Sequence, residues 1–289
     1  MIQRLCVIGV GLIGGSLARS LRSAGAVGSV IGCGRGQPNL EAAMRLGVID
    51  EFTSEPAAAV AGADMVVVAT TLGATGEIFD KIAPAISSHA IVTDVGSAKQ
   101  RVIDLAKISF ADAFPRFVPG HPIAGTEQSG VEASFAELFR DHQVILTPAA
   151  QTDPAALAEV EQMWCATGAI VTHMQADQHD KVLAATSHLP HMLAYALVEC
   201  LASTDKTDNV FNYAAGGFRD FTRIASSSPE MWRDIALDNR AALLRAIGQF
   251  QTTFADLRTA LEREDGDALR QMFSHAKSVR DRALTPRSK

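Results

Sequence analysis

Short apolar runs alternate with amphipathic segments through the first half of the chain. The apolar runs predict strands at residues 4–10, 27–33, 63–70 and 89–95. The segments between them have helical spacing and predict helices at residues 12–25, 39–47 and 76–86. Strands that alternate with helices in this way form βαβ units around a parallel sheet. The first half of the chain is therefore predicted to be an α/β domain.

Two further apolar runs, at residues 142–148 and 168–174, flank a helical segment at residues 154–168. We expect both runs to extend the same sheet. Strand signals stop near residue 175, which predicts a dinucleotide-binding domain over residues 1–174 and an all-helical domain over residues 175–289.

The second half has apolar residues at helical spacing. Pro190 lies inside the pattern at residues 176–202, where its missing amide should kink a helix. Ser228 before Pro229 is a start signal for a second long helix over residues 226–264. Its 3-4-spaced stripe indicates either a core-facing surface or a subunit interface, and the stripe consists of Ile247, Phe250, Phe254, Leu257 and Leu261.

Composition narrows the function. The 289 residues are 47% hydrophobic and 20% charged, as in an ordinary globular protein, and the net charge of −6 argues against a nucleic-acid partner. No apolar run reaches the ~18 residues of a membrane span, and the first strand begins too close to Met1 for a signal peptide. The four cysteines, none in a C-x-x-C pair, are expected to be reduced core thiols of a cytoplasmic protein.

A glycine-rich loop follows the first strand and opens the first helix. Gly9, Gly11 and Gly14 form G-x-G-x-x-G, in which the first glycine makes a tight turn, the second admits a pyrophosphate, and the third allows the helix to pack on the strand. In this context the motif predicts a nicotinamide dinucleotide site at the helix N-terminus.

The second strand ends without the acid that usually binds the adenine ribose. Gly34 stands at that point and Arg35 follows it. An acid would repel a 2′-phosphate, whereas a small residue beside an arginine accommodates one. The sequence therefore favours NADP over NAD, with NAD still possible. The alternative is that Arg35 is only a solvated loop charge. The predicted cofactor-binding residues are Gly9, Gly11, Leu12, Ile13, Gly14, Gly34, Arg35 and Thr70.

Several stretches resemble the prephenate and arogenate dehydrogenases of tyrosine biosynthesis, the TyrA family. They include GVGLIGGSLA, VTDVGSAK, PGHPIAGTEQSG, SHLPHMLA and GGFRDFTRIASSSPEMWRDI, and the likeness runs to about residue 262. The resemblance implies a Rossmann-type domain followed by an all-α dimerisation domain. It also implies a homodimer joined through the helical domains and an NAD(P)-dependent oxidative decarboxylation of prephenate or arogenate.

The same resemblance implies roles for single residues. His121 would be the general base, with a pKa near neutral, and Ser97 would hydrogen-bond the base and the substrate hydroxyl. Arg223 would bind a substrate carboxylate, with Glu127 and Asp220 expected to orient its guanidinium. The implied substrate-binding residues are Arg223, His191, Thr126, Glu127, Asp220 and Trp232.

Other interpretations stay open on the sequence alone. His188 and His191 have a spacing that metal ligands can have, but no third ligand accompanies them, and no metal site is predicted. The chain could be another two-domain NADP-dependent enzyme, a β-hydroxyacid dehydrogenase or imine reductase, or a non-catalytic NADP sensor. A sensor should have lost the base or the carboxylate clamp, yet both are present. Nothing in the sequence separates prephenate from arogenate.

Overall fold

The computed structural model describes residues 1–204 and 209–284. The chain forms two compact units, residues 1–242 and 243–289. The first unit contains every residue that the sequence nominates for the site, so the site is described within it.

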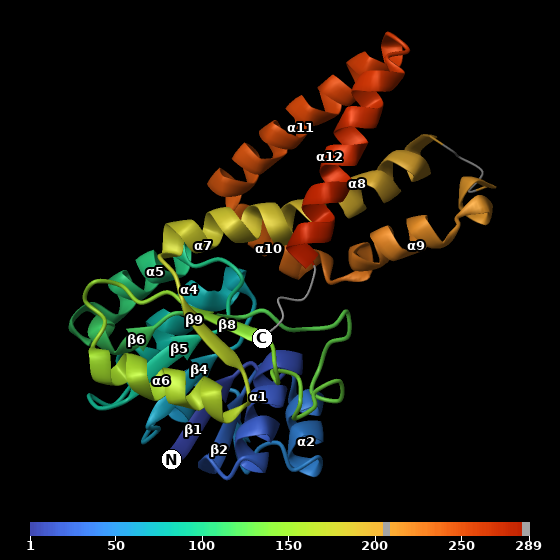
Figure 1. Ribbon diagram of the computed structural model, residues 1–289. Coiled ribbons are helices and arrows are strands. Elements are labelled where there is room, and N and C mark those ends of the chain that lie inside the picture. Colours follow the sequence, from blue (N-terminus) through green and yellow to red (C-terminus); the bar gives the residue numbers. More distant parts are fainter. Residues whose placement is uncertain (205–208, 285–289) are drawn as a thin grey trace. The chain divides into compact units, whose positions relative to one another are not determined.

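A parallel six-stranded sheet organises the first unit (Figure 1). Its order, β3-β2-β1-β4-β5-β6, is the arrangement of a dinucleotide-binding fold. Ile8 at the end of β1 pairs with Cys33 of β2 and with Val68 of β4, so these strand ends meet at one edge. The predicted α/β class is confirmed. The strands are β1 (Ile2–Ile8), β2 (Val27–Cys33), β3 (Glu51–Thr53), β4 (Met65–Val68), β5 (Ile91–Asp94) and β6 (Phe117–Val118).

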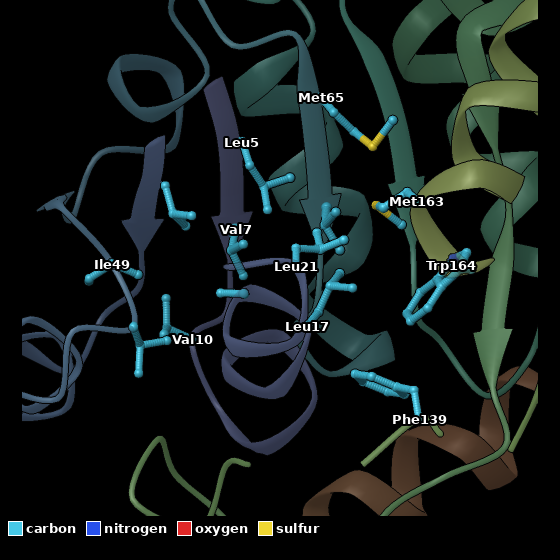
Figure 2. Packing of buried hydrophobic residues seen from close by; sticks show 14 of the residues in the cluster. Leu5, Val7, Val10, Leu17, Leu21, Ile49, Met65, Phe139, Met163 and Trp164 are labelled. Atoms are coloured by element: carbon cyan, nitrogen blue, oxygen red, sulfur yellow. The ribbon is translucent and has the colours of Figure 1, made fainter. Parts of the chain in front are cut away.

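Successive residues of each strand point to opposite faces of the sheet, so the core has two layers, one on each face. Leu5 and Val7 of β1 face one side of the sheet, whereas Cys6 and Ile8 face the other. Figure 2 shows the first layer, where Trp164 of α6 joins the cluster. The helices that contribute to this layer are α1 (Leu12–Ser23), α2 (Gln37–Arg45) and α6 (Pro154–Ala166). Those that contribute to the second layer are α3 (Pro56–Ala59), α4 (Leu72–Ile82), α5 (Gln100–Phe110) and α10 (Pro229–Asp238).

The last three strands form a sheet of their own, so the expectation that they extend the first sheet is wrong. The order is β7-β8-β9, and the strands are β7 (Gly120–Pro122), β8 (Gln143–Leu146) and β9 (Ile170–His173). Pro119 separates β6 from β7 and has no amide to offer a ladder, and β7 pairs with β8 in antiparallel fashion instead. A 3₁₀ turn, Ala111–Arg116, precedes β6.

The second half of the chain is helical, as predicted. The kink expected at Pro190 takes the form of a π-helical turn, Ala184–His188, which joins two helices. The elements, in order, are α7 (Ala176–Leu183), the π turn, α8 (Leu189–Thr204), a 3₁₀ turn (Asn209–Tyr213), α9 (Gly216–Thr222), a 3₁₀ turn (Arg223–Ser226), α10, α11 (Arg240–Glu262) and α12 (Gly266–Leu284).

The single helix predicted over residues 226–264 is in fact two helices. Ser228 caps α10 through its hydroxyl, which accepts from the Met231 amide, as the sequence indicated. The break comes at Asn239, whose backbone leaves helical geometry at φ −100° and ψ 25°. Asn239 is buried, and its side chain donates to the Asp180 carbonyl at 2.8 Å. A long-range polar contact therefore interrupts a stretch that has continuous helical spacing.

The predicted stripe on α11 is only partly covered by the described residues, where Ile247, Phe250 and Leu257 are half-buried. Phe254 and Leu261 are exposed, and the rings of Phe250 and Phe254 stack with their centroids 5.8 Å apart. Phe273 on α12 is exposed as well. Of the two interpretations of the stripe, the exposure favours a subunit interface.

The four cysteines are free thiols that differ in burial. Cys6 and Cys33 are buried on neighbouring strands, as expected, but Cys165 and Cys200 are exposed, which contradicts the expectation that all four lie in the core. Cys165 lies on α6 and Cys200 on α8. Within residues 1–204 and 209–284, no helix combines the length and apolarity that a bilayer crossing requires.

Candidate active site

The glycine loop has the geometry of a phosphate cradle. Gly9 has φ +99°, and a Cβ there would lie 2.4 Å from the Ala69 carbonyl oxygen, so only glycine fits. A Cβ on Gly14 would lie 2.3 Å from the Gly9 carbonyl oxygen. Gly11 differs, because nothing lies within 4 Å of its added Cβ. Two glycines therefore pack the loop, and the third keeps its backbone open to an approaching ligand.

The loop leads into the open N-terminus of α1. Gly11 is the N-cap and offers no side-chain acceptor, so the amides of the first turn, which include those of Leu12, Ile13 and Gly14, are free to bind an anion. Beside the loop, just past β4, the Thr70 hydroxyl is buried without a hydrogen-bond partner in the described part of the chain. A pyrophosphate with an attached ribose would supply acceptors to both groups. These residues fit a nicotinamide dinucleotide.

The adenosine end of this site is also open. Gly34 follows β2, and an added Cβ would make ordinary contact with Leu40 at 3.7 Å. Packing therefore does not require glycine there. Arg35 is exposed and forms no ion pair with any described residue, although its charge helps to lower the pKa of Glu77, which pairs with Lys81. The position usually taken by an acid holds a small residue beside an exposed arginine without an ion pair.

His121 lies on β7, buried and only 8% exposed. Its Nδ1 is 2.9 Å from Nε2 of His179, while its own Nε2 has no hydrogen-bond partner among the residues described. Burial lowers the pKa of His121 well below 6.5, and the neighbouring His179, Lys99 and His188 lower it further. At neutral pH the ring is therefore uncharged, and one nitrogen is available to accept a proton.

A buried ion pair supports the strand that carries His121. The Lys99 ammonium lies 2.5 Å from Oδ2 of Asp94 and donates to the Gly120 carbonyl at 2.7 Å. The other Asp94 oxygen accepts from the Gly120 amide at 3.2 Å. Lys99 is fully buried and Asp94 nearly so. Burial lowers the pKa of Lys99, and the charge of Asp94 opposes this shift. The pair holds Gly120, the residue just before His121, through its carbonyl and its amide.

Ser97 lies in the loop between β5 and α5. It is half-buried, and its hydroxyl makes no hydrogen bond to the described residues. Gly96 beside it is held by the Asp94 carboxylate, which accepts the Gly96 amide at 2.7 Å. The same carboxylate that supports His121 therefore also holds the loop of Ser97.

His191 of α8 stacks on Trp232 of α10, with ring centroids 3.6 Å apart and an angle of 22° between the planes. The Ser187 carbonyl accepts from Nδ1 of His191 at 2.9 Å, which turns Nε2 away from the backbone. Trp232 is buried, and its indole N–H has no partner within the described residues. The stack therefore presents one imidazole nitrogen and lies beside an unsatisfied indole donor.

Glu127 and Arg223 form an ion pair, as expected. The Arg223 side chain is 63% exposed, however, so the guanidinium is not buried as the expectation required. Asp220 on α9 is exposed and forms no ion pair with Arg223 among the described residues, so its role in orienting Arg223 stays a prediction. Thr126, in the loop of Glu127, is exposed and its hydroxyl accepts from the Gln128 amide at 3.2 Å.

Sequence reasoning missed the polar residues behind His121. They come from three stretches of the chain, residues 94–99, 179–180 and 239, and they are Asp94, Lys99, His179, Asp180 and Asn239. No signal in the sequence pointed to these residues, because contacts between segments far apart in the chain bury them.

Comparison with known proteins matches both halves of the chain to one family. Residues 17–173 match the prephenate dehydrogenase nucleotide-binding domain, and residues 175–275 match the prephenate dehydrogenase dimerization domain. A cyclohexadienyl dehydrogenase from Zymomonas mobilis is 38% identical over 97% of this chain and 96% of its own.

Solved structures agree. Prephenate dehydrogenase from Aquifex aeolicus, in complex with hydroxyphenyl propionate and NAD+, has a TM-score of 0.92 at 37% identity, covering 98% of this chain and 99% of its own. Synechocystis arogenate dehydrogenase has a TM-score of 0.81 at 29% identity, covering 98% and 100%. The family models take in the His121 strand and most of the helical half, and the chain belongs to the prephenate dehydrogenase family.

Proposed function

We propose that this protein catalyses the NAD(P)-dependent oxidative decarboxylation of prephenate or arogenate in tyrosine biosynthesis. The observation that carries the proposal is the state of His121, which is buried, uncharged at neutral pH and open at one ring nitrogen. A general base needs an uncharged ring with a free nitrogen, and His121 has both, although its pKa lies below the near-neutral value that the sequence led us to expect. Family membership argues against the hydroxyacid dehydrogenase and imine reductase alternatives, and the intact base and carboxylate clamp argue against a sensor.

The reaction divides among few groups. Nε2 of His121 takes the proton of the ring hydroxyl, while hydride leaves the ring carbon that bears this hydroxyl. Carbon dioxide departs from the opposite end of the ring, which becomes aromatic. A bound nicotinamide supplies the hydride acceptor. Ser97, with its uncommitted hydroxyl, is the group proposed to hold the substrate hydroxyl toward the base.

Binding of the substrate carboxylate is assigned to Arg223 and His191. Arg223 already pairs with a carboxylate, that of Glu127, and it can exchange that partner for the substrate. His191 presents Nε2 from a ring held by Trp232. Thr126, Glu127 and Asp220 would lie around the entrance. Because its side chain is exposed, Arg223 must lose water when the substrate binds, and this cost favours a fixed planar guanidinium over a flexible ammonium.

NADP is the proposed cofactor of choice. The support is the open position at Gly34 and the exposed guanidinium of Arg35, which forms no ion pair with any described residue. The Aquifex aeolicus relative was solved with NAD+, and the family as a whole therefore does not decide between the two cofactors.

The proposed architecture is a homodimer that joins through the helical half. The support is the partly exposed apolar stripe on α11 and the match of residues 175–275 to a dimerization domain. The boundary at residues 174 and 175 stays a prediction, as does the cytoplasmic location. Sedimentation should give twice the 30.7 kDa chain mass at micromolar concentration, and a monomer there would contradict the dimer.

Steady-state turnover tests the function. The purified protein should oxidise prephenate, arogenate or both, with release of carbon dioxide, and NADP+ should give the lower KM. Simple β-hydroxyacids serve as the control substrates. Turnover of those hydroxyacids without turnover of either cyclohexadiene would overturn the assignment.

A further inference from the structure

A chain of hydrogen bonds links three buried polar side chains and ends at His121. Nδ1 of His121 lies 2.9 Å from Nε2 of His179, and Nδ1 of His179 lies 2.8 Å from Oδ1 of Asp180. His179 is fully buried and Asp180 is 6% exposed. His121 comes from β7, whereas the other two come from α7, so the chain of hydrogen bonds crosses between two elements.

Asp180 is anchored at the far end of this chain of hydrogen bonds. Oδ1 accepts the Lys99 amide at 2.8 Å, and Oδ2 accepts the Gln100 amide at 3.0 Å. These amides begin α5, whose N-cap residue has no capping side chain of its own. Burial alone would raise the pKa of Asp180, but the hydrogen bonds from His179 and the two amides lower it. Asp180 is therefore an ionised carboxylate and can only accept.

The acceptor at one end decides the proton positions along the chain of hydrogen bonds. Because Asp180 only accepts, Nδ1 of His179 must donate. Burial lowers the pKa of His179 and keeps the ring uncharged, so its Nε2 carries a lone pair. Nδ1 of His121 must then donate to that lone pair, and Nε2 of His121 is left without a proton.

We propose that His179 and Asp180 are positioning residues that hold His121 in the Nδ1–H tautomer, with Nε2 directed at the proton it removes. The inference rests on the proposed function, because it names what orients the base of that reaction. No proton needs to leave His121 at Nδ1. A proton arriving at Nε2 makes an imidazolium whose charge is balanced through His179 by the Asp180 carboxylate.

Other charged groups near His121 leave this assignment unchanged. Lys99 faces the site but is paired with Asp94 at 2.5 Å. His188, on the π turn, accepts from the Asn239 amide at 3.0 Å through Nδ1, and burial lowers its pKa to about 4. His188 is therefore neutral at pH 7. The carboxylate of Asp180 is the unbalanced charge of the group and can stabilise a protonated His121.

The tautomer can be measured directly in the wild-type protein. Long-range ¹H–¹⁵N spectra of ¹⁵N-histidine-labelled protein at pH 7.5 distinguish a protonated Nδ1 from a protonated Nε2, and a His121→Asn sample identifies the His121 signals. We expect the proton on Nδ1. A proton on Nε2 would overturn the proposal without reference to any variant.

Two substitutions then separate shape from hydrogen bonding. His179→Phe keeps a buried ring but offers no acceptor, whereas His179→Gln offers both an amide acceptor for His121 and a donor for Asp180. His179→Phe should give mixed tautomers at His121 and a kcat about 10- to 100-fold lower, with KM and cofactor Kd within about threefold of wild type. His179→Gln should recover most of the kcat and the Nδ1–H signal.

His173→Phe, at an exposed ring on β9, is the matched control and should leave kcat unchanged. Equal losses in the Phe and Gln variants, with melting temperatures near wild type, would show that His179 acts only in packing and would overturn the proposal. If the wild type turns over neither cyclohexadiene, the proposed function fails, whereas the tautomer spectra still decide the arrangement at His121.

Discussion

Replacing Lys99 by methionine should strongly destabilise the first unit. Methionine keeps most of the length and the buried apolar stem but removes the ammonium. The Asp94 carboxylate would then stay buried, with only the Gly96 amide at 2.7 Å and the Gly120 amide at 3.2 Å to stabilise its charge. The Gly120 carbonyl would lose its donor as well.

The magnitude follows from burial. Lys99 is 0% exposed and Asp94 is 3% exposed by side chain, so removing one partner leaves an uncompensated buried charge, which costs about 3–5 kcal/mol. For a unit of 242 residues each kcal/mol shifts the melting temperature by about 2–4 °C. The expected decrease is therefore about 6–20 °C. Part of it should return in the double variant Asp94→Asn/Lys99→Met, which has no charge to bury.

Thermal scans and urea unfolding at pH 7.5 measure the loss. Lys81→Met is the matched control, because Lys81 forms a pair of similar length with Glu77, 2.6 Å, on an exposed helix surface. Water screens that pair, and its removal should barely move the melting temperature. The reasoning about buried charge fails if the Lys99 and Lys81 variants unfold at the same temperature.

Three further predictions concern pH and ligands. The free energy of unfolding should fall as the pH drops from 6.5 toward 4, because the buried His188 has a pKa of about 4 in the folded chain and the unfolded chain binds the proton at a higher pH. The pKa difference corresponds to about 3 kcal/mol. A His188→Gln variant should flatten this decline in urea titrations, and an unchanged dependence of stability on pH would contradict the assignment. Arg35→Ala should raise the KM for NADP+ by about 10- to 100-fold and leave that for NAD+ unchanged, whereas equal KM values in the wild type would refute the phosphate contact. Arg223→Ala should lower kcat/KM for the cyclohexadiene by roughly 2–4 kcal/mol, with partial rescue by lysine and no change in cofactor Kd; a loss of cofactor affinity instead would place the arginine elsewhere.

The sheet and the glycine loop could be predicted because local patterns determine them. A run such as residues 63–70 is apolar enough to be a buried strand wherever it lies, and Gly9 needs its positive φ for the short turn, residues 9–11, between β1 and α1. Which sheet a strand joins is not local. The run at residues 142–148 predicts a strand, but its pairing with β7 depends on where Pro119 turns the chain.

The polar network could not be predicted for the same reason. Asn239 interrupts a helix because of its contact with Asp180, 59 residues earlier, and no periodicity reports such a contact. His179 and Asp180 are buried only because α7 packs on the start of α5. The candidate base came from the family resemblance and not from the local pattern, which alone would favour a loop histidine, and the groups that decide its tautomer emerge only from the tertiary structure.

The π-helical turn stores one extra residue at the junction of α7 and α8. Each residue of an α-helix advances the chain by about 100°, and the π turn holds one more residue than a regular turn would. Deleting the exposed Ala185 should therefore leave a continuous α-helix in which α8 keeps its rotation relative to α7. Deleting a residue outside the turn, between Asp180 and His191, should instead rotate α8 by about 100°, and His191 could then no longer stack on Trp232 while Asp180 keeps its place on α5. This junction should tolerate the loss of one residue at the π turn, whereas the same loss elsewhere should separate the substrate-binding ring from the base.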